Sequence, residues 1–269
     1  GAVHSGMLKA SGSTFANNRA NTKGSDQWGN GTGQAARVAT KIYKTTIRNA
    51  ATNAVGGGIY SQGALTITGG TIEGNYTSSG TGGGVYIEIG RLALSGSTVA
   101  GNRGNAFGGG LYIAGGAGHV ITNSVFVSNT ANQGAGLATR ADTPLTVYNS
   151  TIYSNTALNG SGGGVYATPA LTILGGAIYS NTSNSNGAGV YAYGALTMTN
   201  VTVKGNFNSV SSYGAGAFAN AGATISGSRF ENNSCTGACN GAGLYTYDPA
   251  ALLTLVDTQF ISNVATNVG

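Results

Sequence analysis

The sequence predicts an all-β fold: a right-handed, single-stranded parallel β-helix (β-solenoid) with about ten coils of ~26 residues, three short strands per coil and no caps. Three observations carry this prediction. The 269 residues include 48 glycines but only 3 prolines, 12 basic and 7 acidic side chains; two short motifs recur along almost the whole chain; and a third segment alternates apolar and polar residues. Disorder, collagen and membrane-spanning helices are excluded, because charge is low, the glycines lack a three-residue period and no apolar run approaches ~20 residues.

The first motif reads Gly, Gly or Ala, Gly, an apolar residue and, in most copies, Tyr. Its eight copies lie at Gly56–Tyr60, Gly82–Tyr86, Gly108–Tyr112, Gly134–Ala138, Gly162–Tyr166, Gly187–Tyr191, Gly214–Phe218 and Gly241–Tyr245. Successive copies are 25 to 28 residues apart. Glycine adopts a positive φ or a close backbone approach without strain, so this motif predicts a tight corner once per coil.

The second motif is an apolar residue followed three positions later by asparagine. The asparagines that occupy this position are Asn18, Asn75, Asn102, Asn129, Asn155, Asn181, Asn206, Asn233 and Asn263, and Ala50 replaces one of them. Asparagine tolerates the left-handed conformation, and stacked amides can hydrogen-bond along a column. We therefore expect these residues to form an asparagine ladder.

A third segment, such as Leu65–Ile67 or Leu145–Val147, alternates apolar and polar residues. Three strands separated by turn residues make one coil, in which each strand pairs with its counterpart one coil away at ~4.8 Å. The pattern predicts a single domain over residues 1–269. A loop insertion is expected at residues 19–32, with the only tryptophan, Trp28, docking on a neighbouring subunit or covering an apolar patch of its own chain.

The pairing of GG[A/G]-[ILV] with F-x-x-N resembles the repeats of the polymorphic outer membrane protein family, whose surface passengers are right-handed β-helices. The resemblance covers essentially all 269 residues. It implies a solenoid of pectin-lyase-like architecture, and a role in adhesion or surface display.

Alternation along the first motif predicts an exposed column of aromatic side chains, which we call the aromatic column. Its members are Tyr60, Tyr86, Tyr112, Tyr166, Tyr191, Phe218 and Tyr245, with a gap at Ala138. Exposed rings at strand spacing could bind carbohydrate or a neighbouring filament. The alternative is a ladder that only stabilises the stacking of coils.

The two ends of the sequence fit together in phase, because Gly1 of a second copy placed after Gly269 keeps the spacing of the repeat. This predicts head-to-tail stacking, and an excised fragment of a longer repeat chain is the alternative. The first 48 residues carry a net charge of +6 and residues 205–269 a net charge of −2, which favours one polarity. The residues expected at the subunit interface are Gly1, Ala2, Val3, Leu8, Lys9, Trp28, Lys41, Lys44, Phe260, Ile261, Asn263, Val268 and Gly269.

Two smaller features complete the surface. Cys235 and Cys239 are the only cysteines, and a disulfide between them in the loop at residues 234–240 would fit an oxidising, extracellular compartment. Outward positions place Arg48 beside Glu73 and Lys204 beside Glu231, which predicts two weak cross-strand ion pairs.

Catalysis is not expected, since no two of the seven acidic residues share a column in adjacent coils, and His4 lies about four coils from His119. No cofactor, metal, nucleic-acid partner or membrane span is expected. The sequence favours a secreted or cell-surface structural subunit of an extracellular filament whose partner is itself. The alternatives are a surface adhesin that binds carbohydrate or a host surface, and then a carbohydrate-active enzyme.

Overall fold

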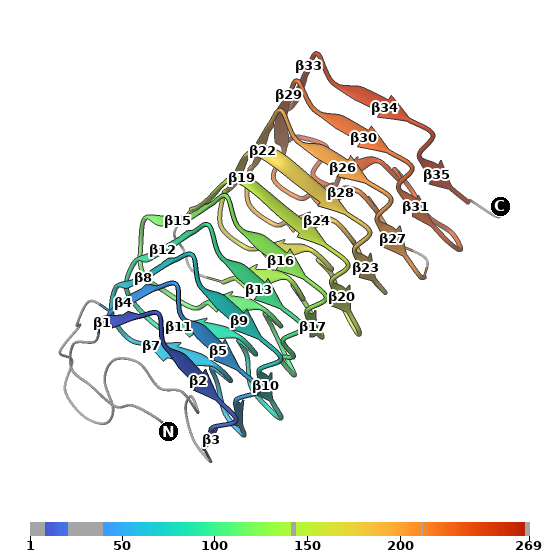
Figure 1. The fold of residues 1–269 in the computed structure, drawn as a ribbon. Helices are drawn as coiled ribbons and strands as arrows, with labels where there is room; N and C mark the ends of the chain where they lie inside the picture. The colour runs from blue at the N-terminus through green and yellow to red at the C-terminus, as the bar shows by residue number, and fades with distance from the viewer. Residues whose placement is uncertain (1–8, 21–39, 141–143, 211, 267–269) are drawn as a thin grey trace.

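A computed structural model describes residues 9–20, 40–140, 144–210 and 212–266. The elements in these ranges are all strands, and every pair of them is parallel. They wind into a rod, with β1 near one end and β33 and β34 at the other (Figure 1). The strands form four ladders that run along the rod, one for each segment of the repeating coil.

The first ladder holds the alternating leucine-rich segments, and it gives the number of coils. Its strands are β1 (Lys9–Ser11), β4 (Thr40–Tyr43), β8 (Leu65–Thr68), β12 (Leu92–Ser95), β15 (His119–Thr122), β19 (Leu145–Tyr153), β22 (Leu171–Tyr179), β25 (Leu196–Thr199), β29 (Ala223–Ser226) and β33 (Leu253–Val256). Ten levels make about nine turns between the first and the last. The predicted repeat of the coil is therefore confirmed.

The second ladder precedes the asparagines. It contains β2 (Thr14–Ala16), β5 (Thr46–Arg48), β9 (Thr71–Glu73), β13 (Thr98–Ala100), β16 (Val125–Val127), the second halves of β19 and β22, β26 (Thr202–Lys204), β30 (Arg229–Glu231) and β34 (Gln259–Ile261). In β19 and β22 the first and second segments of the coil run together as one nine-residue strand. These two ladders therefore join into one sheet.

A third ladder of two-residue strands follows the asparagines and was not predicted. It contains β3 (Arg19–Ala20), β6 (Ala51–Thr52), β10 (Tyr76–Thr77), β17 (Thr130–Ala131), β20 (Thr156–Ala157), β23 (Thr182–Ser183), β27 (Phe207–Asn208), β31 (Ser234–Cys235) and β35 (Val264–Ala265). Arg103 bridges Tyr76 to Thr130 and keeps this ladder continuous. A coil that is described in full thus has four segments where the sequence predicted three.

This ladder contradicts the first two residues of the insertion predicted at residues 19–32. Arg19 and Ala20 belong to β3 and pair with β6, so they continue the coil past Asn18. Residues 21–39, with Trp28, lie outside the described residues.

The fourth ladder carries the glycine motif. Its strands are β7 (Ile59–Ser61), β11 (Val85–Ile87), β14 (Leu111–Ile113), β18 (Leu137–Thr139), β21 (Val165–Ala167), β24 (Val190–Ala192), β28 (Ala217–Ala219) and β32 (Leu244–Thr246). Aliphatic side chains from the first, second and fourth ladders point inward and form one continuous core along the rod. Each coil buries its share of that core against the coils on either side of it.

Candidate functional site: the asparagine ladder and the ends of the rod

The asparagine ladder forms as predicted and lies inside the rod. From Asn75 to Asn233 its side chains are fully buried. At each step the backbone N–H and the Nδ2 amide of one asparagine both donate to Oδ1 of the next, at 2.8–3.0 Å, through all seven steps from Asn75 to Asn263. The ladder therefore has a direction: donors point toward the C-terminal end and acceptors toward the N-terminal end.

The second Nδ2 hydrogen ties each asparagine to the previous coil. It donates to the carbonyl oxygen that lies three residues before the preceding ladder position, as from Asn102 to Ile72 at 2.9 Å and from Asn263 to Phe230 at 2.8 Å. A left-handed residue comes directly before each asparagine, for example Gly74 or Ser128, and turns the chain so that the side chain points inward. A buried amide would be costly if unpaired, so this full set of bonds keeps the ladder stable.

The two motifs of the sequence meet at this ladder. The third glycine of each glycine motif lies against an asparagine, so that a β-carbon on Gly84 would sit 3.0 Å from the amide carbon of Asn102. These third glycines leave room for the asparagine side chains. The first glycine of the motif is needed for a left-handed backbone conformation, since Gly56 has a φ of +67°.

Asn18 lies in the same column but outside the continuous ladder. Ala50 occupies the intervening position, and its backbone N–H donates to Oδ1 of Asn75 at 3.0 Å. The expectation that Asn18 belongs to the asparagine ladder is therefore not met, because Ala50, which replaces the asparagine between them, has no side-chain amide to continue the bonds.

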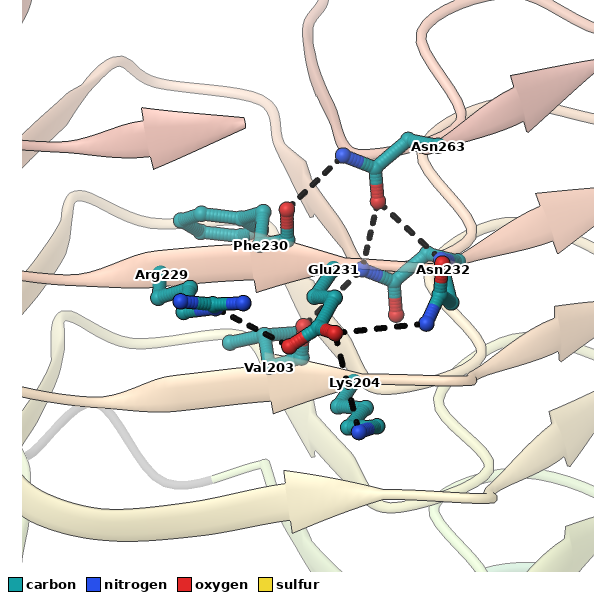
Figure 2. A network of polar contacts seen from close by, with 8 residues as sticks. Val203, Lys204, Arg229, Phe230, Glu231, Asn232 and Asn263 are labelled. Atoms are coloured by element: carbon teal, nitrogen blue, oxygen red, sulfur yellow. Dashed lines mark hydrogen bonds and ion pairs between the residues drawn. The ribbon is translucent and has the colours of Figure 1, made fainter. Parts of the chain in front are cut away.

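Within the described residues Asn263 is the last rung of the ladder, and a cluster of charged side chains lies on the neighbouring strands β26 and β30 (Figure 2). Glu231 accepts a hydrogen bond from Nε of Arg229 at 2.9 Å and lies 3.7 Å from Nζ of Lys204. The hydrogen bond from Arg229 lowers the pKa of Glu231. Both predicted cross-strand pairs are present, with Arg48 and Glu73 4.0 Å apart, whereas the contribution of Arg229, two residues before Glu231 on the same strand, was missed.

The last coil leaves its apolar side chains open. Leu253, Leu255 and Phe260 are 40%, 44% and 44% exposed. Their counterparts one coil earlier are buried: Ala223 is 3% exposed, and Ile225 and Phe230 are 0% exposed. The difference arises because an inward side chain of a β-helix is covered from both sides along the axis, and the described residues supply only one side here.

The structure describes some of the residues that were expected at a subunit interface. Lys9, Lys41 and Lys44 are exposed on the first coils, and Lys9 is the direct neighbour of Lys41 across the strands. Phe260 is exposed, and Ile261 and Asn263 are partly exposed, on the last coil. Residues expected at the interface that lie outside the described residues are Gly1, Ala2, Val3, Leu8, Trp28, Val268 and Gly269.

The aromatic column stacks as predicted, but the prediction that it is exposed is wrong. Neighbouring rings stack at 4.9–5.8 Å, and Tyr60, Tyr112 and Phe218 are at most 6% exposed. The remaining members are half-buried: Tyr86, Tyr166, Tyr191 and Tyr245. One cause is the glycine corner, which passes close to the base of each ring: a β-carbon on Gly56 would lie 2.9 Å from Cβ of Tyr60. The ring faces are therefore covered by one another.

Phe107 covers the gap that Ala138 leaves in this column. Its ring lies 5.8 Å from that of Tyr112 and 5.7 Å from that of Tyr166. Burial raises the pKa of Tyr112 and of Tyr166, and the nearby Arg140 guanidinium partly opposes the rise. Among the described tyrosines outside the column, Tyr193 and Tyr247 are the most exposed, at 54% and 61%, and each lies two residues after a member of the column.

Cys235 and Cys239 form the predicted disulfide. Both are buried, and they pack with Ala215 and Ala242 in a small apolar cluster beside the main core. The bond therefore fixes the loop between β31 and the following glycine corner.

His119 occupies an inward position that is leucine in the neighbouring coils, Leu92 and Leu145. It is 1% exposed, its Nδ1 accepts the backbone N–H of Leu92 at 3.2 Å, and its Nε2 makes no hydrogen bond in good geometry. Burial lowers the pKa of His119, and the backbone of Gly116 opposes this in part. Sequence reasoning used His119 only to test for a triad and did not recognise it as a core residue.

A shallow groove of about 420 Å³ on the described surface is lined by Asn49, Glu73, Gly74, Ala100, Gly101, Val127 and Ser128. It contains a single carboxylate, whereas glycoside hydrolysis generally uses two. Within the described ranges, no three His, Cys, Asp or Glu side chains gather where they could hold a metal ion. None of the described segments is a helix long and apolar enough to cross a membrane.

Comparison with known proteins agrees with this geometry. A family model described as a right handed beta helix region matches residues 90–260. No curated protein and no solved structure matches the chain.

Proposed function

Because the chain belongs to the right-handed β-helix family, we propose that it is a structural subunit of an extracellular filament. A coil of a solenoid buries its apolar side chains only against neighbouring coils. Copies stack head to tail, so that the first coil of one copy covers the last coil of another. The exposure of Leu253, Leu255 and Phe260 carries this proposal.

The edges of the sheets support the same arrangement. In the described residues β33 and β34 are the last strands of the first and second ladders, and β1 and β2 are the first strands. A β-edge with free N–H and C=O groups is a template for a further strand. The two ends are different surfaces, so the contact between them is heterologous and repeats without closing.

Charge supports one polarity. Exposed Lys9, Lys41 and Lys44 lie on the first coils, and exposed Asp248 and Asp257 lie on the last. Opposite charges attract across the proposed contact and like charges repel in the reverse one. The disulfide supports a secreted or cell-surface location, because such bonds persist in oxidising compartments.

Sedimentation velocity and negative-stain microscopy of the purified chain test the proposal. We expect rods that lengthen with protein concentration. Leu255→Asp, which places a charge on the open apolar face, should shorten them, whereas Leu252→Asp at a 78% exposed neighbour should not. Monodisperse single rods at the highest concentration would contradict the proposal.

A second candidate, binding of carbohydrate as a surface adhesin, is favoured by Tyr193 and Tyr247. Their rings are exposed, whereas the rings of the aromatic column are stacked on one another. Titration with neutral hexasaccharides, followed by calorimetry on the wild type and on Tyr193→Ala with Tyr247→Ala, tests it. Equal heats from both proteins would contradict this role.

A further inference from the structure

Asn263 is the last rung of the asparagine ladder in the described residues, and several of its polar groups lack the partners that internal rungs have. Within the described residues, the backbone N–H and one Nδ2 hydrogen of Asn263 lack the Oδ1 acceptor that the next rung supplies at every internal step. Two carbonyl groups lack their usual donors as well. At the previous step the carbonyls of Phe230 and Asn233 accept from Asn263 Nδ2 and Val264 N, and those of Phe260 and Asn263 occupy the same places one coil on.

Asn18 offers the complementary groups at the other end. It follows Asn17, whose φ is +58°, as Asn263 follows Ser262, whose φ is +50°. Its carbonyl accepts from Ala51 N at 3.0 Å, as the carbonyl of Asn233 accepts from Val264 N at 2.9 Å. The backbone of Asn18 therefore has the geometry of a ladder position. Within the described residues its side chain makes no hydrogen bond.

Building on the proposed head-to-tail stack, we infer that Asn263 of one copy continues its ladder onto Asn18 of the next copy. Oδ1 of the incoming Asn18 accepts both donors of Asn263. Its Nδ2 donates to the carbonyl of Phe260, and the backbone N–H of Arg19 donates to the carbonyl of Asn263. Four hydrogen bonds then repeat the internal step.

This match fixes both polarity and register. Two Asn263 ends could not supply the missing acceptor, because Oδ1 of Asn263 already accepts from Asn233. Two Asn18 ends would bring together two Oδ1 acceptors without the paired donors of Asn263. Rotating one copy about the axis would place Asn263 against a corner that has no asparagine side chain.

In the inferred register Ile261 lies beside Ala16 of the next copy, as Glu231 lies beside Ile261 within the chain. Their Cα atoms would then be ~4.8 Å apart, within the range a disulfide can bridge.

Cysteine cross-linking of mixed variants tests the register. Ala16→Cys mixed with Ile261→Cys should give a disulfide-linked dimer on mild oxidation, detected as a dimer band in denaturing electrophoresis that a reductant abolishes. Arg48→Cys mixed with Ile261→Cys is the matched control, because residue 48 lies one coil further and out of reach. Equal cross-linking in both mixtures, or dimers of Ala16→Cys alone, would overturn the inferred register or polarity.

A second comparison tests Asn18 itself. Asn18→Ala should weaken association at least tenfold in sedimentation while leaving the melting temperature unchanged. Asn17→Gly, which removes an exposed amide from the neighbouring left-handed position, should associate like the wild type. If the wild type associates but Asn18→Ala does so equally, the ladder inference fails and the filament stands. If the wild type does not associate at all, both fail.

Discussion

Gly84 packs directly against Asn102: a β-carbon on this glycine would lie 3.0 Å from the amide carbon of Asn102 and 2.5 Å from the carbonyl oxygen of Gly110. Gly84→Ala should therefore destabilise the fold by about 3 kcal/mol, because neither neighbour can move without breaking the ladder. Gly96→Ala is the control. It adds only the cost of a left-handed alanine, about 1 kcal/mol, since nothing lies within 4 Å of its β-carbon. Urea denaturation measures both, and equal losses would contradict this account.

An internal rung of the ladder should be among the most sensitive positions in the chain. Asn155→Ala removes the acceptor for two donors of Asn129 and the donors to Phe126 and Asn181, and it leaves their partners buried. We expect a loss of about 4 kcal/mol in unfolding free energy. Asn159→Ala, which removes one exposed side-chain bond, should change stability by about 0.5 kcal/mol or less. A similar loss for both variants would show that a buried ladder bond stabilises the fold no more than an exposed side-chain hydrogen bond does.

The repeat and the interior ladder could be predicted because they rest on spacing. Gly58 and Asn75 recur with their counterparts at fixed intervals, and a parallel β-helix is the fold that brings such intervals into columns. The exposure of the aromatic column could not be predicted in this way. It depends on how closely the Gly56 corner passes the base of Tyr60, and on Phe107, which lies outside the motif.

Short strands and substituted core positions were missed for a related reason. Tyr76–Thr77 is too short to show alternation, so the third ladder has no signal in a single coil. His119 replaces leucine in only one coil, and a lone polar residue in a β segment gives no indication of which way it points.

Acid should weaken the fold through His119. Its folded pKa lies below the ordinary value of 6.5, so the unfolded chain binds more protons wherever the pH is under about 6.5. The stabilisation by the neutral form is therefore complete above that pH and is lost as the pH falls, by up to ~1.4 kcal/mol per pH unit until the folded pKa is reached. Thermal unfolding between pH 7.5 and 4.5 measures the slope. His119→Leu should flatten it, and an unchanged slope would assign the acid sensitivity to other groups.

Reduction should loosen the end of the rod that carries the disulfide. Breaking the bond between Cys235 and Cys239 frees the loop after β31, and we expect a loss of about 2 kcal/mol. The pair Cys235→Ala with Cys239→Ala keeps the small apolar cluster and removes the bond. A reductant should lower the melting temperature of the wild type and leave that of the double variant unchanged. Equal sensitivity of the two proteins would indicate that another effect of the reductant is being measured.

Phe107 and Ala138 should behave as one unit, because the ring of the first occupies the space that an aromatic side chain at the second would fill. Phe107→Ala should cost about 3 kcal/mol by opening a gap between Tyr112 and Tyr166. Ala138→Tyr alone should also destabilise, because the new ring would overlap Phe107 at a position that is 0% exposed. Combined, the two changes restore an unbroken column of rings. The loss in unfolding free energy of the double variant should therefore be smaller than the sum of the two single losses, by at least about 1 kcal/mol. Strict additivity in a double-mutant cycle would show that Phe107 does not substitute for the missing ring.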